Sequence, residues 1–210
     1  MVDLEYENKA REQGYKNICG IDEAGRGPLA GPVCAAAVIL PKDKIIEGIN
    51  DSKKISEKRR EKIFEDILKE AVSVGIGWAS VEEIEEINIL NAAMLAMKRA
   101  VDNMKVKPDF VYIDGNTTPP LGIDCEAVTG GDAKIMSVAA ASIVAKVSRD
   151  RLMREYAEEY PDYGFEKHKG YGTKAHTAAI LEYGACPLHR PSFLKKLYAK
   201  NGKKDEQKTT

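Results

Sequence analysis

The sequence is poor in the residues on which several large classes of protein depend. It has 4 Cys in 210 residues, with no C-x-x-C pair, and only 3 His. This argues against a disulfide framework or a thiolate metal site, and we expect the cysteines to pack as small core residues. No apolar run reaches the roughly 18 residues of a membrane span, and the N-terminus is charged from its third residue. We therefore expect a cytoplasmic protein with no membrane partner.

The motifs of several common enzyme classes are missing too. The sequence has no G-x-S-x-G, no P-loop, no dinucleotide-binding fingerprint and no H-E-x-x-H. His168, His176 and His189 all lie in the last third of the chain, where lone histidines are more typical of surface or capping positions than of a catalytic triad. Serine–histidine catalysis is therefore a poor explanation of this chain.

Net charge is nearly absent, because 32 Lys and Arg balance 33 Asp and Glu. At first sight this argues against a nucleic-acid partner, since phosphate binding relies on basic residues. The charges are unevenly distributed, however: residues 134–204 carry 14 Lys or Arg against 7 Asp or Glu, and residues 82–86 hold an acidic block. The asymmetry permits a phosphate-binding face, although solvated helix surfaces explain it at least as well.

Strand-like and helix-like segments alternate along most of the chain. Apolar runs bounded by turn residues predict strands at 18–22, 33–40, 74–79, 110–113 and, more weakly, 125–128. Helical spacing predicts helices at 56–71, 88–104, 138–160 and 175–182, with a helix start at Ser80 and Glu83. We expect an α/β fold, with a sheet covered by helices and a helical C-terminal region.

The same pattern suggests one continuous domain. We expect an N-terminal lead-in at 1–16, an α/β catalytic part at 17–160, a helical region at 161–200 packed on the same domain, and a flexible tail at 201–210.

Acidic residues follow two of the predicted strands. Asp22 and Glu23 come at the end of the first strand, and Asp114 follows the run 110–113. Ligands of open α/β sheets bind at the carboxyl ends of strands, so these acids are expected to share one site. Clustered carboxylates raise one another's pKa, and a divalent cation relieves that repulsion. Oxygen-only ligands favour Mg²⁺ or Mn²⁺.

The segments around these acids resemble one enzyme family. Residues 20–32, GIDEAGRGPLAGP, look like the signature of the type 2 ribonuclease H family, ribonuclease HII. Further matches follow in the same order along the chain, at 50–54 (NDSKK), 113–115 (IDG), 131–132 (GD), 139–150 (AAASIVAKVSRD), 168–173 (HKGYGT) and 189–193 (HRPSF). The resemblance covers residues 17–195.

This resemblance implies an RNase H-like fold, a mixed sheet flanked by helices. It also implies that Asp22, Glu23, Asp114 and Asp132 correspond to the family's four active-site acids, which bind Mg²⁺ or Mn²⁺. Asp132 ranks below the other three, as a ligand or as the group that orients the attacking water. The implied reaction is two-metal hydrolysis of the RNA strand of RNA/DNA hybrids, with cleavage 5′ to single ribonucleotides in duplex DNA, leaving 5′-phosphate and 3′-OH ends.

The resemblance also implies how the substrate is read. RNA differs from DNA in its 2′-OH. In the family, the loop matching Gly25, Arg26 and Gly27 contacts that hydroxyl, and the tyrosine matching Tyr171 packs on the neighbouring deoxyribose. Arg26 is expected nearest the scissile phosphate. Further backbone contacts are expected from Ser52, Lys53, Lys146, Arg149 and Lys169, with Lys146 and Arg149 on one helix face.

Other interpretations stay open at this point. Without the resemblance, Asp22 is typical of a strand-to-turn junction, Asp132 of a turn or N-cap, and Tyr171 of turn packing. A non-catalytic hybrid-binding module or another metal nuclease of the same fold would also place acids at strand ends. The four intact acids argue against the first, and the G-R-G and K-G-Y-G-T segments against the second. We expect a monomer.

Overall fold

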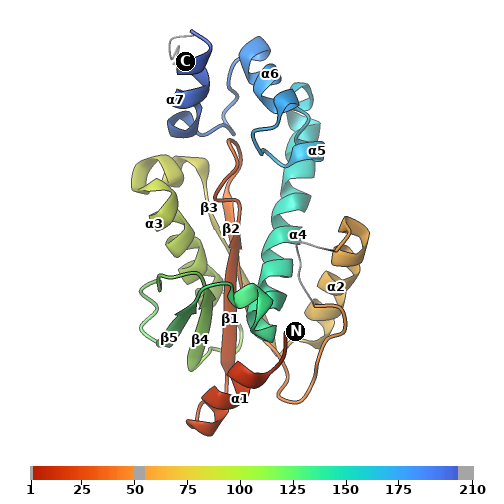
Figure 1. The fold of residues 1–210 in the computed structure, drawn as a ribbon, viewed down its shortest axis with the longest axis vertical. Helices are drawn as coiled ribbons and strands as arrows, with labels where there is room; N and C mark the ends of the chain where they lie inside the picture. The colour runs from red at the N-terminus through yellow and green to blue at the C-terminus, as the bar shows by residue number, and fades with distance from the viewer. Residues whose placement is uncertain (1, 50–54, 203–210) are drawn as a thin grey trace.

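The centre of the molecule is a five-stranded sheet, described by a computed structural model that covers residues 2–49 and 55–202 (Figure 1). The order is β3-β2-β1-β4-β5. β1 pairs antiparallel with β2 and parallel with β4, so the predicted mixed sheet is confirmed. The strands are β1 (Ile18–Ala24), β2 (Val33–Ile39), β3 (Ser73–Ala79), β4 (Phe110–Asp114) and β5 (Asp124–Val128), close to the predicted ranges.

Helices flank the sheet and form the C-terminal region. Those at the sheet are α1 (Glu5–Glu12), α2 (Glu57–Glu70), α3 (Val81–Asp102) and α4 (Met136–Glu159). The C-terminal region holds α5 (Phe165–His168), α6 (Lys174–Tyr183) and α7 (Pro191–Lys200), and short 3₁₀ turns lie at η1 (Gly131–Ala133) and η2 (Pro161–Tyr163). Within the described residues, no helix is both long and apolar enough to span a bilayer.

The start of α3 follows the prediction closely. Ser80 and Glu83 form a capping box, in which each accepts a hydrogen bond from the backbone N–H of the other. The helix is interrupted at Asn88, which adopts a left-handed φ of 67°. The Asn88 side chain then accepts from the N–H groups of Leu90 and Asn91 and starts the second half of α3.

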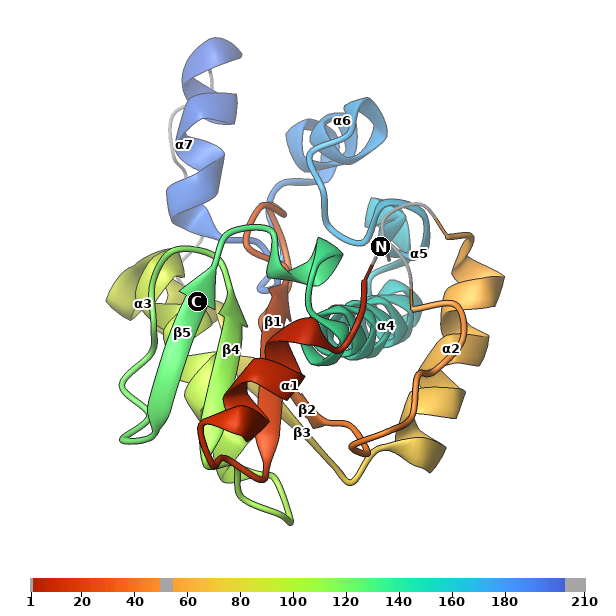
Figure 2. The same cartoon turned by 60° about the horizontal axis from the view of Figure 1, so that its bottom comes forward.

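Opposite faces of the sheet are covered by different helices (Figure 2). Cys34, Ala36 and Val38 of β2 pack into a core with α2 and α4. Ala35 and Ala37, which alternate with them, pack into a core with α3. Because both faces are covered, β2 is apolar along its whole length.

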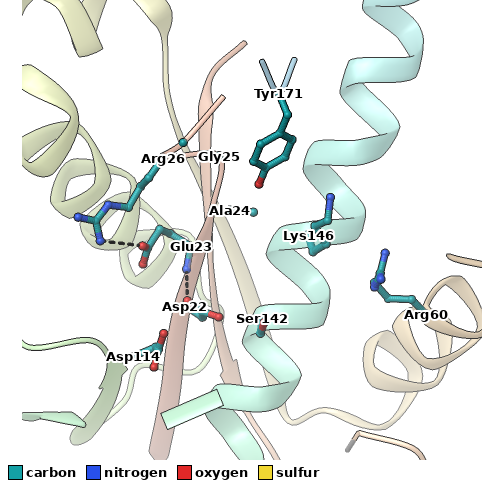
Figure 3. A pocket seen from close by; sticks show the side chains of 11 residues that line it. Asp22, Glu23, Ala24, Gly25, Arg26, Arg60, Asp114, Ser142, Lys146 and Tyr171 are labelled. Carbon is teal, nitrogen blue, oxygen red and sulfur yellow. Dashed lines mark hydrogen bonds and ion pairs between the residues drawn. The ribbon is translucent and has the colours of Figure 1, made fainter. Parts of the chain in front are cut away.

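Close packing of β1 against α4 positions the site. A side chain on Gly20 of β1 would collide with the backbone of Ser137 at the start of α4. Glu7 of α1, which the sequence analysis did not predict as helical, accepts a hydrogen bond of 2.8 Å from the Ser137 N–H. The packing of α4 against β1 brings Ser142 and Lys146 of α4 beside the carboxyl end of β1 (Figure 3).

The C-terminal helices gather beyond the loop that joins β1 to β2 (Figure 1). Three backbone hydrogen bonds tie that loop to them: the Leu29 N–H donates to Gly170, the Gly31 N–H to Leu188, and the Arg190 N–H to Leu29. The C-terminal region therefore supports the loop from behind.

Candidate active site

A pocket of about 540 Å³ opens at the carboxyl ends of β1 and β4 (Figure 3). It combines three carboxylates, the loop after β1 with its Arg26, two further basic side chains and an aromatic ring. Its lining consists of Asp22, Glu23, Ala24, Gly25, Arg26, Gly27, Arg60, Asp114, Ser142, Lys146 and Tyr171. The structure thus brings together the acids of two strands and the G-R-G segment.

Strand register explains why the acids meet. β1 and β4 run parallel with Ile21 opposite Ile113, so Asp22 and Asp114 occupy the next position on each strand. Adjacent strands lie about 4.8 Å apart. Glu23 is the next residue of β1, which ends at Ala24 before Gly25 turns the chain with a φ of +104°.

Hydrogen bonds hold all three of these carboxylates in place. Asp22 Oδ1 accepts from the Glu23 N–H at 2.7 Å, and the Ser142 side chain also bonds to Asp22. Asp114 Oδ1 accepts from the Gly131 N–H at 2.8 Å. Glu23 is paired with Arg26, whose Nη1 donates to it at 3.2 Å.

The pocket floor concentrates negative charge in a poorly solvated place. Burial raises the pKa of Asp22 well above its usual range, and the charges of Glu23 and Asp114 raise it further. Burial also raises the pKa of Glu23, with Arg26 opposing the shift and Asp114 adding to it. Ionising Asp22 and Glu23 together is therefore unfavourable, and positive charge brought close to them would offset the cost.

The fourth predicted acid lies apart from this group. Asp132 is in η1, directly after the Gly131 that bonds to Asp114, and it is half-buried. It falls outside the lining of the pocket. Among residues 2–49 and 55–202, no set of three or more His, Cys, Asp or Glu side chains is already arranged to hold a metal ion. Glu23 shows one reason, since its carboxylate is turned to Arg26.

Basic side chains face the acids from two helices (Figure 3). Lys146 of α4 lines the pocket, as does Arg60 of α2, and both lie near Asp150. Arg60 and Ser142 were not among the predicted site residues. Ser142 could have been found from its spacing, because it precedes Lys146 by four residues and so shares its helix face.

Arg149 is a correction to the predicted phosphate contacts. Only 1% of it is exposed, and its guanidinium donates to the carbonyls of Ala30, Pro32 and Lys169, each at 2.9 Å. Arg149 lies almost one turn beyond Lys146 along α4, where the loop after β1 covers it. Its charge holds the backbone and is not presented to a ligand.

Lys169 is a second correction. It is 7% exposed, has a left-handed φ of 53°, and its ammonium donates to the carbonyl of Glu166. Tyr171, two residues on, does reach the pocket and is 44% exposed. Ser52 and Lys53 lie outside the described residues.

The histidines also differ from the expectation of surface or capping positions. His176 and His189 are buried, with their Nε2 atoms 3.1 Å apart, and burial lowers the pKa of each to about 4. His168 is half-buried and stacks on His176. Of the cysteines, Cys19 and Cys34 are buried as predicted, whereas Cys125 and Cys186 are half-buried.

Known proteins resemble this chain over most of its length. A family model described as Ribonuclease HII matches residues 19–198. A ribonuclease HII of Acetivibrio thermocellus is 57% identical over 190 residues, which cover 90% of this chain and 74% of the relative. One of Caldicellulosiruptor bescii is 53% identical over 194 residues, covering 92% and 94%. The crystal structure of ribonuclease H2 from Pyrococcus horikoshii superposes with a TM-score of 0.73 at 25% identity, over 90% of this chain and 100% of that one.

Proposed function

The chain belongs to the ribonuclease HII family, endonucleases acting on RNA/DNA hybrids, and on that premise we propose that its pocket also cleaves 5′ to single ribonucleotides in duplex DNA. One observation carries the proposal: the carboxylates share a pocket with the Gly25–Gly27 loop and Tyr171. Catalytic acids and the elements that would read the sugar are therefore within reach of one nucleotide step.

Mg²⁺ or Mn²⁺ is the proposed cofactor, held by Asp22, Glu23 and Asp114. The donors are carboxylate oxygens, which suit hard divalent ions, and burial together with neighbouring carboxylates raises the pKa of Asp22 and Glu23, which a bound cation would offset. Two bound ions would supply an activated water and charge stabilisation at the leaving 3′ oxygen. Glu23 would give up its bond to Arg26, leaving that guanidinium for the scissile phosphate. Asp132 stays a lower-ranked ligand or water-orienting group.

Sugar recognition is assigned to two neighbouring walls. A Cβ built on Gly27 would lie 3.8 Å from Cε1 of the Tyr171 ring, so loop and ring border one narrow space (Figure 3). The bare glycine backbone permits close approach to a ribose 2′-OH. The exposed Tyr171 ring offers a flat apolar surface to the next deoxyribose.

Phosphate contacts are assigned to Lys146 and Arg60. Both side chains line the pocket on the side opposite Asp114 (Figure 3). A nucleic-acid strand lying over the carboxylates would pass its phosphates beside these two basic side chains. Arg149 and Lys169 are excluded from this role by their burial.

Four matched duplexes test the proposal: all DNA, all RNA, an RNA/DNA hybrid, and DNA with one ribonucleotide, each with Mg²⁺, Mn²⁺ or chelator. We expect cleavage of the hybrid and of the single-ribonucleotide duplex, with a 5′-phosphate on the ribonucleotide, and none in chelator. Binding without cleavage in either metal would instead favour a non-catalytic hybrid-binding module. Cleavage in chelator would contradict the metal assignment.

A further inference from the structure

Two adjacent residues, His189 and Arg190, lie behind the proposed substrate pocket. His189 is 2% exposed, Arg190 is fully buried, and both fall outside the pocket lining. The segment pairs with the loop after β1 through a bridge between His189 and Ala30. Each side chain then reaches toward a different wall of the pocket.

Arg190 holds the loop wall. Its guanidinium makes five hydrogen bonds, at 2.6 to 3.1 Å, and all go to carbonyls of the loop: those of Gly25, Arg26, Pro28 and, twice, Gly31. An arginine has five N–H donors in a fixed plane, so one side chain can bond all of these carbonyls at once. The proposed 2′-OH-reading segment is thus fixed from behind.

His189 reaches the other wall through His176. The backbone N–H of Cys186 donates to His189 Nδ1 at 2.9 Å, so the neutral ring carries its proton on Nε2. That Nε2 then donates to His176 Nε2 at 3.1 Å, which leaves the His176 proton on Nδ1. His176 Nδ1 donates in turn to the carbonyl of Tyr171 at 2.9 Å. All three hydrogen bonds are therefore consistent with neutral rings that carry the proton on Nε2 in His189 and on Nδ1 in His176.

We propose that His189 and Arg190 form a positioning element that sets the gap between the Gly25–Gly27 loop and Tyr171, and thereby the preference for a ribonucleotide–deoxyribonucleotide junction. The inference rests on the proposed function of that gap. Two walls read two successive sugars only if their separation is fixed to a fraction of an ångström. The loop is rich in glycine, so its backbone conformation would otherwise vary. Because His189 and Arg190 are adjacent in the chain, they fix the positions of the loop and of Tyr171 relative to each other.

Arg190→Lys is the first test, because it keeps the positive charge but removes the planar guanidinium whose N–H groups bond to the loop. We expect kcat on the single-ribonucleotide duplex to fall about tenfold or more, and its preference over a continuous hybrid to fall with it. KM and the affinity for Mn²⁺, measured by calorimetry, should change less than threefold, since the fork does not touch the carboxylates. Arg99→Lys is the matched control, because Arg99 donates to the Trp78 carbonyl and to Glu83 and makes none of the hydrogen bonds that hold the loop.

A pair of His176 variants distinguishes loss of the hydrogen bond to Tyr171 from a general loss of stability. Asparagine puts its amide nitrogen near the place of Nδ1 and keeps a donor for Tyr171, whereas glutamine reaches only the place of Nε2. Both remove the same buried ring. We expect His176→Gln to lose junction preference as Arg190→Lys does. His176→Asn still bonds to the Tyr171 carbonyl but no longer reaches His189, so it should lose only part of the preference at an equal folded fraction, measured by circular dichroism.

The outcomes distinguish the two proposals. If the wild-type protein shows no junction cleavage, the proposed function fails, and this inference fails with it. If the wild type prefers the junction, and folded Arg190→Lys and His176→Gln proteins prefer it equally, only the positioning element is overturned. Should Arg190→Lys fail to fold, equal preference in the two His176 variants overturns it instead.

Discussion

Two groups of charged or titratable side chains meet around the pocket, and the protein treats them in opposite ways. On the floor, Asp22 and Glu23 are crowded by each other and by Asp114, and burial raises the pKa of both. Behind the pocket, Arg149 and Arg190 are buried more completely, yet their donors are taken up by backbone carbonyls. The pKa of Arg190 falls only to about 9, so it stays charged at neutral pH.

The contrast shows where unfavourable energy is tolerated. A carboxylate that is short of positive charge binds a cation strongly, so crowding on the floor serves the proposed chemistry. A buried guanidinium whose donors are all satisfied has nothing to gain from a ligand, and it fixes the chain around it. The floor is therefore the proposed reactive part of the pocket, and the layer behind it supports the backbone. Each prediction below tests one side of that division.

The largest effect is expected on the floor. Asp114→Asn keeps the acceptor for the Gly131 N–H but removes one proposed metal ligand. We expect kcat/KM on a single-ribonucleotide duplex to fall by about 10³-fold or more, a loss of roughly 4 kcal/mol in transition-state stabilisation, and Asp22→Asn should behave alike. Asp102→Asn, which removes an exposed carboxylate paired with Lys98, is the control. If the kcat/KM of Asp114→Asn stays within tenfold of wild type, the carboxylates of the pocket floor do not take part in the reaction.

Next in size is the layer behind the pocket. Arg149→Met leaves the carbonyls of Ala30, Pro32 and Lys169 buried without their donor, and we expect the free energy of unfolding to drop by about 3 kcal/mol. Arg154→Met removes partly exposed ion pairs from the same helix and should cost less than about 1 kcal/mol. Urea denaturation measures both. Equal losses would mean that the buried bonds contribute no more than surface ones.

The buried histidines behind the pocket and the carboxylates on its floor should contribute to stability with opposite dependence on pH. The folded pKa of His176 and His189 is about 4 against an ordinary 6.5, so the unfolded chain binds more protons between these values. Their contribution is fully present above pH 6.5 and is lost as pH falls to 4, by about 3 kcal/mol for each histidine. Asp22 and Glu23 have raised pKa values, so their contribution is present at low pH and is lost as pH rises.

Unfolding free energies measured in chelator from pH 7.5 to 4.5 separate these trends. His176→Gln should flatten the loss of stability on acidification. Asp114→Asn should steepen it, because Asp22 and Glu23 lose one of the charges that raise their pKa. Slopes that move in the same direction would contradict the division.

Tyr171 lies where the two groups meet, exposed in the pocket but anchored through its carbonyl to His176. Tyr171→Ala should impair cleavage of a junction about tenfold, while affinity for a continuous hybrid, measured by fluorescence anisotropy, falls less than threefold. Equal losses in the two measurements would show that the ring has only a structural role.

The smallest expected effect concerns salt. Lys146→Gln should reduce the slope of log affinity for a hybrid against log salt by about 1, because one phosphate contact is lost. Arg149→Lys should leave the slope unchanged, because the Arg149 side chain is buried. A reduced slope in Arg149→Lys would instead indicate that Arg149 contacts a phosphate of the substrate.

The division also explains what could be predicted from the sequence. Strands and acids at strand ends are local features, and parallel pairing then brings Asp22 and Asp114 together. The burial of Arg149 and Arg190 depends instead on carbonyls more than 100 positions away in the chain. A basic residue on a helix looks the same in sequence whether solvent, phosphate or a distant loop covers it. The sequence alone likewise does not show that His176 and His189 are buried against each other.

Thermal unfolding in chelator and in Mn²⁺ tests the central claim most directly, that the carboxylates oppose one another until a cation joins them. We predict that Asp114→Asn unfolds in chelator at the same temperature as wild type or higher, since one repelling charge is gone. Added Mn²⁺ should raise the wild-type transition and leave that of the variant nearly unchanged. An equal rise in both proteins, or a variant that is less stable in chelator, would contradict the account.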